Sequence, residues 1–106
     1  MTTQDKINLL VLEKVFGNDA QKDCPTTIPD FYGDIVEAWK VIEKLNPSRL
    51  SLTYHREPPY WECRFGDGPV SVTPSAPAAI TLAGLAAKGV DAQQLYEEWM
   101  VEFLLT

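Results

Sequence analysis

The sequence is poor in the residue types and motifs from which catalytic and metal sites are built. Among its 106 residues there is one histidine, His55, and there are two cysteines, Cys24 and Cys63, at distant positions. No glycine-rich phosphate loop is present, and no serine or cysteine stands in a nucleophile-elbow context. The spacing of His55 and the two cysteines matches no metal site. We therefore expect no catalytic residue, no metal and no cofactor, and a protein that is not an enzyme.

Long hydrophobic runs and an excess of positive charge are also missing. No apolar stretch reaches the roughly 18 residues that a membrane-spanning helix needs, and residues 1–5 (MTTQD) lack the basic and apolar regions of a signal peptide. We expect a cytoplasmic protein without membrane contact, whose two thiols stay free in a reducing compartment. The net charge of −6 argues against binding to a nucleic-acid backbone.

The clearest periodic signal lies in residues 33–45 (GDIVEAWKVIEKL). Asp34 is placed to cap a helix, and Asn46 before Pro47 ends it. A tryptophan on an apolar helical stripe is usually a core residue, so we expect Trp39 to be buried and this helix to anchor the core. A ligand platform at Trp39 is the alternative. The stripe follows the 3.6-residue period and consists of Ile35, Ala38, Trp39, Ile42 and Leu45.

Three short segments that follow this helix alternate between apolar and polar residues, as strands do. They are residues 49–56, 60–65 and 70–72. A proline-rich turn at residues 57–59 separates the first two, and an Asp-Gly turn at residues 67–68 follows the second. The pattern predicts a three-stranded antiparallel meander with one buried face.

Helical patterns precede and follow these strands. Residues 3–16 form the first, Ser75 caps another that stops at Gly89, and Asp91 caps a last one. The alanines around Gly84 suggest a close approach to a neighbouring element rather than a function. The chain length fits one α+β domain, residues 1–106, in which residues 91–106 form an additional C-terminal helix.

The last helix carries an aromatic face that supports two interpretations. The face either completes the core of the monomer or contacts a protein partner, including a second copy in a homodimer. Glu102 lies near the C-terminal end of this helix, where the helix dipole disfavours an anion. The residues that would anchor an interface are Tyr96, Trp99, Met100 and Phe103.

All three arginines lie between residues 49 and 64, although the chain as a whole is acidic. Arg56 and Tyr60 flank the same turn, and Arg64 follows on the same strand. Guanidinium groups and an aromatic ring could bind a small anion such as a nucleotide. The alternative is a chance cluster on a solvated sheet.

Residues 18–33 form a long connector without periodicity. Long loops are often binding loops. A strap packed across the sheet, held by Ile28, Phe31 and Tyr32, is the interpretation that we favour.

Four spaced segments resemble the phage ABA sandwich domain family. Residues 10–17 (LVLEKVFG) resemble its opening segment, and residues 32–45 (YGDIVEAWKVIEKL) resemble its central helix. Residues 61–65 (WECRF) and 76–85 (APAAITLAGL) are similar to the strand and the helix that follow. The resemblance covers roughly residues 7–90 and concerns the fold.

This resemblance implies a three-layer α/β/α sandwich in the element order α-α-β-β-β-α-α. The sequence departs from the family pattern at Asn18, at the Gly33-Asp34 cap and in the helix that begins at Asp91. The resemblance also implies a small accessory protein of phage or prophage origin, but it carries no shared catalytic residues.

We therefore expect non-catalytic binding to a host or phage protein, with counter-defence among the roles open to it. Capture of a small anion or a nucleotide signal is the alternative. A small enzyme, for which residues 55–57 (HRE) offer an acid/base pair, is less favoured because adjacent strand residues point to opposite faces.

Overall fold

The computed structural model describes residues 2–17 and 28–105. The predicted α+β class, the order of the elements and the antiparallel sheet are all confirmed. Asn18 and Cys24, singled out above, lie outside the described residues. The elements are α1 (Thr3–Lys14), α3 (Ile35–Leu45), β1 (Leu50–Arg56), β2 (Pro59–Phe65), β3 (Ser71–Thr73), α4 (Ala76–Ala87) and α5 (Ala92–Leu105).

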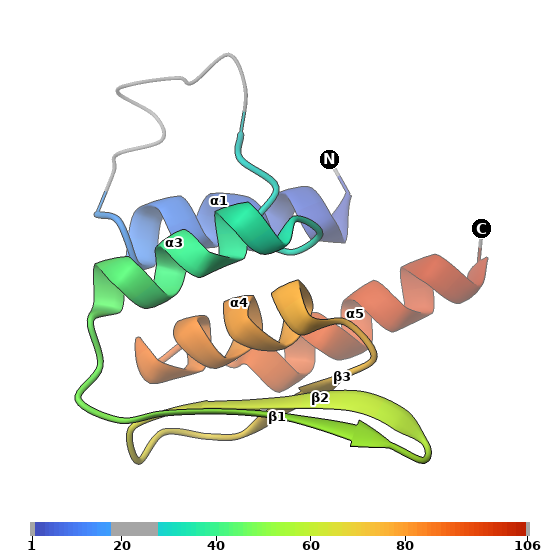
Figure 1. Ribbon diagram of the computed structural model, residues 1–106. Coiled ribbons are helices and arrows are strands. Elements are labelled where there is room, and N and C mark those ends of the chain that lie inside the picture. Colours follow the sequence, from blue (N-terminus) through green and yellow to red (C-terminus); the bar gives the residue numbers. More distant parts are fainter. Residues whose placement is uncertain (1, 18–27, 106) are drawn as a thin grey trace.

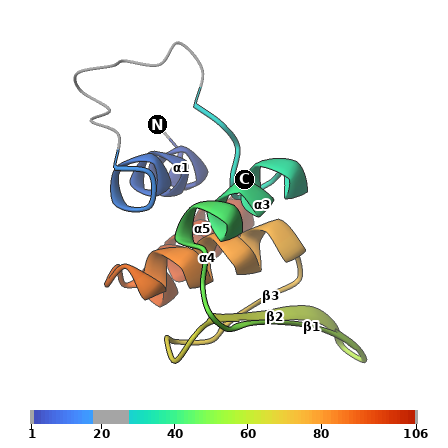
Figure 2. The ribbon, with the colours of Figure 1, turned by 60° about the vertical axis from the view of Figure 1, so that its left-hand side comes forward.

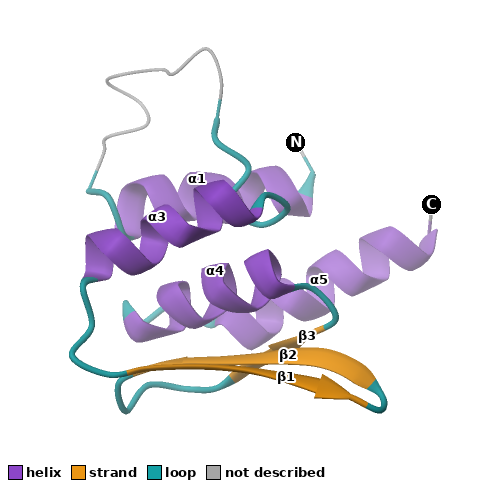
Figure 3. Ribbon diagram, viewed as in Figure 1, coloured by secondary structure: helices purple, strands orange, loops and turns teal. Residues whose placement is uncertain are grey.

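Helix α4 occupies the middle of three layers. Figure 1 shows α4 directly over the sheet, with α1 and α3 above it and α5 at its side. Every residue from Ala78 to Leu85 is buried, so this helix is enclosed on all sides. The expected three layers are therefore present, but the middle layer is a helix rather than the sheet. All helices of the described residues lie on one side of the sheet (Figures 2 and 3).

The strand register explains why the sheet keeps one face open. β2 lies between β1 and β3, and Leu52 pairs with Cys63 in the antiparallel ladder. Cys63 and Phe65 are buried against α4. The opposite face carries mostly polar side chains, which do not need a covering layer. They include Ser51, Thr53, His55, Tyr60, Glu62 and Arg64.

Local capping interactions form where the sequence predicted them. Thr2 and Asp5 make a capping box at the start of α1. The Asp34 carboxylate accepts a hydrogen bond from the N–H of Val36 at 2.9 Å, and the Asp91 carboxylate accepts one from Gln94 at 3.1 Å. Ser75 caps α4, and Asn46 ends α3 in the left-handed conformation with φ of 44°. These side chains satisfy helix-end groups that have no partner within the helix.

The prediction that Trp39 is a core residue was wrong. Its side chain is 48% exposed, and Ile35 is exposed beside it. α3 instead buries Ala38 and Val41 against α4. A Cβ placed on Gly84 would lie 2.7 Å from Cγ1 of Val41, so the two helices approach too closely to leave room for an indole between them. The close approach suggested by Gly84 is thus present, and it displaces Trp39 to the outside.

The described part of the connector packs on helices and not across the sheet. The Thr81 hydroxyl donates a hydrogen bond to the carbonyl of Phe31 at 2.6 Å. The N–H of Tyr32 donates to Oδ1 of the buried Asn8 at 3.0 Å. The Phe31 ring also stacks on Phe16 at 5.3 Å. Residues 28–34 therefore tie α1 to α4, which corrects the expected position of the strap.

Polar contacts join the first turn of α1 to the second half of α5. The Glu102 carboxylate accepts a hydrogen bond from the N–H of Thr3 at 3.0 Å and another from its hydroxyl. Nζ of Lys6 lies 3.3 Å from a carboxylate oxygen of Glu98. Glu102 thus lies at the N-terminal end of α1, where the dipole of that helix favours an anion. In the described ranges no helix has the length and apolarity to cross a membrane.

Replacing Gly84 with alanine should lower the free energy of unfolding by about 1–2 kcal/mol, measured by urea denaturation. The clash with Val41 costs about 1–3 kcal/mol, and the better helix propensity of alanine recovers up to about 1 kcal/mol. The double variant Val41→Ala/Gly84→Ala should lose less than the sum of the two single changes. An unchanged or more stable Gly84→Ala variant would contradict the close approach of α3 and α4.

Removing the Glu102 carboxylate should also destabilise the fold. We expect Glu102→Ala to lower the free energy of unfolding by about 1 kcal/mol, because two hydrogen bonds to Thr3 are lost. The control is Glu97→Ala on the same helix, an exposed position where the change should stay within about 0.5 kcal/mol. Equal effects of the two substitutions in thermal or urea unfolding would argue against the link between α5 and α1.

Candidate functional site

The end of α5 carries the two most exposed large hydrophobic side chains of the described residues, Leu105 and Leu104. Phe103 is 63% exposed and Leu105 is 82% exposed, and Val101 and Leu104 are exposed as well. We call these four residues the α5 tip. Figure 1 shows the last turns of α5 extending past the N-terminal end of α4. Large apolar side chains that are exposed side by side often mark a contact surface, so the α5 tip is a candidate for one.

The predicted interface residues divide between core and surface. Trp99 lies 5.2 Å from Tyr32 and 5.3 Å from Phe103, measured between ring centroids. Tyr96, Trp99 and Met100 are half-buried, whereas Phe103 is exposed. The inner part of the aromatic face therefore packs on the body of the protein, and its outer part continues into the α5 tip. Sequence reasoning missed Val101, Leu104 and Leu105, although the unbroken apolar run at residues 103–105 was a usable signal.

Acidic side chains surround the α5 tip. A shallow groove of about 520 Å³ runs along this side of α5, between Val101 and Leu105 on one hand and the start of α1 on the other. Lys6 pairs with Glu98, while Glu97 is exposed and receives only a weak 3.5 Å hydrogen bond from Gln93. The full lining is Thr3, Gln94, Glu97, Glu98, Val101, Glu102 and Leu105. The surroundings of the tip are thus both apolar and negatively charged.

A second hydrophobic surface lies on α3. Ile35, Val36 and Trp39 are exposed together on its first two turns, and we call them the α3 patch. Val36 is the most exposed of them, at 64%. Lys40 and Glu43 border a shallow groove of about 400 Å³ that these residues line. The patch is exposed because α3 packs on α4 through Ala38 and Val41, which leaves Trp39 outside that contact.

The structure does not bring together the residues proposed for anion binding. His55 pairs with Tyr60 across the strands, so Tyr60 and Arg64 lie on the polar face while Arg56 lies on the other face. Tyr60 stacks on His55 with ring centroids 4.3 Å apart. Between Tyr60 and Arg64 lies Glu62, whose carboxylate is 3.6 Å from Nε2 of His55. Anion capture by Arg56, Tyr60 and Arg64 stays a prediction without a common site.

A different pair of arginines converges near the start of β1. Arg49 contacts Oδ1 of Asp67 at 2.5 Å, and Arg64 lies 3.8 Å from the same oxygen. Both arginines and Asp67 are strongly exposed. Because exposed ion pairs contribute little energy, this cluster is typical of a solvated surface. Asp67 also already occupies the position that an incoming anion would take.

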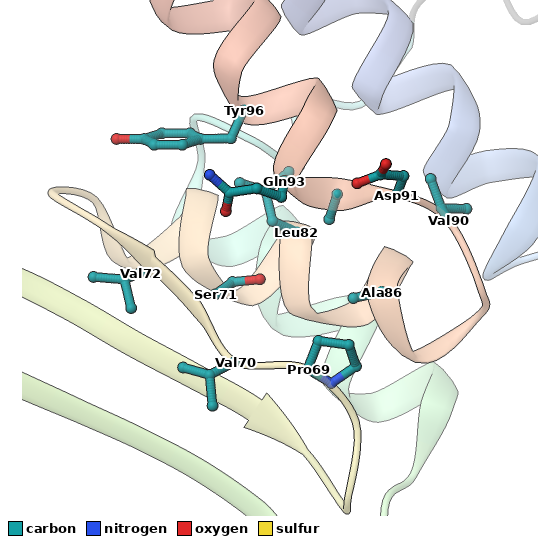
Figure 4. A pocket seen from close by; sticks show the side chains of 11 residues that line it. Pro69, Val70, Ser71, Val72, Leu82, Ala86, Val90, Asp91, Gln93 and Tyr96 are labelled. Carbon is teal, nitrogen blue, oxygen red and sulfur yellow. The ribbon is translucent and has the colours of Figure 1, made fainter.

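A small pocket lies between β3 and the beginning of α5 (Figure 4). Its volume is about 190 Å³, below the roughly 300–1,000 Å³ of typical small-molecule sites. Asp91 on its rim is already used to cap α5. Figure 4 shows the Tyr96 hydroxyl pointing away from the cavity. The walls are Pro69, Val70, Ser71, Val72, Leu82, Ala86, Val90, Asp91, Ala92, Gln93 and Tyr96.

The buried titratable groups are held in their neutral forms. Burial raises the pKa of the Cys63 thiol to about 12, and a backbone hydrogen bond from Arg64 offsets part of this effect. Burial also raises the pKa of Tyr32, with a smaller contribution from Tyr96. Neutral thiols are poor nucleophiles and poor metal ligands. Among the described residues no cluster of three or more His, Cys, Asp or Glu side chains is placed to hold a metal ion.

The raised pKa of Cys63 makes stability depend on pH in the alkaline range. Below pH 9 the thiol is protonated in both states, and above that value only the unfolded chain loses its proton. The stability advantage of the wild type over Cys63→Ala should therefore fall as pH rises from about 9 towards 12, by at most about 1.4 kcal/mol per pH unit. Paired urea denaturation curves at each pH measure this difference. A constant difference from pH 8 to pH 11 would contradict the burial of the thiol.

Comparisons with known proteins identify the fold family. The crystal structure of a phage protein from Bacillus cereus ATCC 14579 matches with a TM-score of 0.69 and 28% sequence identity, over 85% of this chain and 90% of that chain. None of the curated proteins matches. The family model of the phage ABA sandwich domain matches residues 6–85. The chain therefore belongs to the phage ABA sandwich domain family, as its four motifs predicted.

Proposed function

We propose that this protein acts by non-catalytic binding to a host or phage protein, and that the α5 tip is its contact surface. The observation that carries the proposal is the exposure of four large apolar residues on one helical turn. A partner with an apolar pocket would remove this surface from water, at about 25 cal/mol per Å². Phe103 supplies the aromatic anchor that dominates many protein interfaces.

The attachment of α5 supports this assignment because it holds the tip in place before binding. Glu102 is hydrogen-bonded to Thr3, and Trp99 packs on Tyr32 one turn before the tip. A helix that is ordered in advance loses less conformational entropy on association. α5 also lies beyond residues 6–85, which match the family model. The tip is thus an element that the shared family region does not include, which suits a partner particular to this protein.

The charge around the tip indicates the chemistry of the partner. α5 carries Glu97, Glu98 and Glu102 and no lysine or arginine. A partner whose apolar pocket has a basic rim would match this surface. Association should then slow as the salt concentration rises, because the attraction between exposed charges is screened. The charge would guide the encounter, and the apolar tip would supply most of the affinity.

The family of the chain indicates in which cell the proposed binding would take place. The chain belongs to a phage domain family, and the similar solved structure is that of a phage protein. Such a protein would meet its partner in the cytoplasm of the bacterial host. Through such binding the protein would interfere with a host process, counter-defence included. The family itself supplies no activity, because one fold supports many functions.

The proposal is tested by affinity capture from a lysate of the bacterial host, with and without phage infection. Each partner captured by the wild type is quantified against Phe103→Ala/Leu105→Ala, which changes only exposed side chains. We expect at least about a tenfold loss of the specific partner, as for anchor residues in other interfaces. Trp39→Ala, which truncates an exposed aromatic side chain on α3, is the control and should keep the partner.

Circular dichroism melting must first show that all three proteins are equally folded. Equal capture by the wild type and Phe103→Ala/Leu105→Ala would exclude the α5 tip as the contact surface. Loss of the partner with Trp39→Ala alone would move the site to α3. A wild type that enriches nothing over empty resin in either lysate would contradict the binding function itself.

A further inference from the structure

The α3 patch is separate from the α5 tip and carries its own inference. Ile35, Val36 and Trp39 lie on the outer layer of the molecule, where α3 is seen at the surface in Figures 1 and 2. Packing on α4 does not use these side chains, because Ala38 and Val41 provide that contact. Truncating them should therefore leave the core intact. A molecule that covers this apolar surface must match its shape and its charge.

The distribution of charge distinguishes between possible occupants. The chain carries a net charge of −6, so most faces of two copies repel each other. Along α3 the charges nearly balance, since Glu37 and Glu43 are matched by Lys40 and Lys44, with Asp34 at the N-cap. On the α5 side three glutamates face one lysine, Lys6, so this surface keeps a net negative charge and two such surfaces would repel each other. A second copy of the chain is thus compatible with α3 and not with α5.

We infer that two copies of this protein associate through their α3 patches, with the two helices antiparallel about a two-fold axis near Trp39. A two-fold contact joins the same patch on both copies, so the patch must be complementary to itself. Lys40 and Glu43 border the patch and lie about 4.5 Å apart along the helix axis, at 1.5 Å per residue. Reversing one helix about an axis at Trp39 offsets Lys40 of one copy from Glu43 of the other by about 7.5 Å along the helices, at 1.5 Å per residue, which the two long side chains can span.

The same arrangement buries the apolar part of the patch. Near the axis the two Trp39 side chains meet, flanked by Ile35 and Val36 of each copy. Aromatic pairs and their buried area contribute strongly to such contacts. Lys40 already lies 3.0 Å from Glu37 in the same helix. It can therefore contact Glu43 of the second copy only by sharing or exchanging that partner, which favours a dimer that dissociates readily.

Sedimentation or light scattering of the purified chain tests the inference. We expect a concentration-dependent dimer at about 100 µM for the wild type and at least about tenfold weaker association for Trp39→Ala. Phe103→Ala is the matched control and should dimerise like the wild type, because it alters the α5 tip instead. A wild type that is monomeric at this concentration, or dimerisation lost with Phe103→Ala and kept with Trp39→Ala, would overturn the inference.

Charge reversal provides a second, sharper measurement. Lys40→Glu leaves two glutamates beside the patch, and Glu43→Lys leaves two lysines, so each variant alone should associate at least about tenfold more weakly than the wild type. Mixed in equal amounts, the two variants should form a heterodimer, because each meets the opposite charge. Absence of association in the mixture would refute the two-fold pairing. Partner capture by the α5 tip is measured separately, so either proposal can fail without the other.

Discussion

The burial of α4 on all sides is the constraint on which the rest of the structure depends. A helix between two layers must carry apolar side chains around its whole circumference. Ile80, Leu82 and Leu85 of α4 are all buried. Where a neighbouring helix packs closely against α4, it must also carry a small residue, and Gly84 does so at the contact with Val41. The sheet and the layer of α1 and α3 each cover one side of this single helix. The positions of all other elements follow from this contact.

The exposed apolar residues can be understood from the same constraint. Because α3 and α4 approach closely at Val41 and Gly84, the indole of Trp39 does not enter this contact and lies beside it. The polar face of the sheet, with Glu62 and Arg64, needs no cover and offers little apolar surface. Besides Leu50, Tyr54, Val70 and Val72 on or beside the sheet, the exposed large hydrophobic side chains therefore lie on α3 and at the end of α5. Neither surface contributes to the core, so both can change without unfolding the protein.

Local features were predictable from the sequence and tertiary placements were not. The caps at Asp34, Ser75 and Asp91 depend on a few neighbouring residues, and so do the alternating strands. Periodicity identified the α3 helix, but it could not say that Gly84 would select the Val41 side for packing. Glu102 was expected to oppose its own helix dipole, since nothing local reveals a partner 99 positions away at Thr3. The exposure of the α5 tip could not be predicted from the sequence, because it depends on where the neighbouring helices end.

The proposed anion site illustrates a related limit. Arg56 and Tyr60 are close in the chain, but closeness along a hairpin does not decide which face a side chain occupies. The register that pairs His55 with Tyr60 separates Arg56 from both other residues. The α5 tip and the α3 patch were likewise recognised from the exposure of their side chains in the structure, not from their positions in the sequence. If two copies join through α3, each particle carries two α5 tips. A dimer does not change which residues a single partner molecule contacts, so the α5 tip and the α3 patch remain separate surfaces.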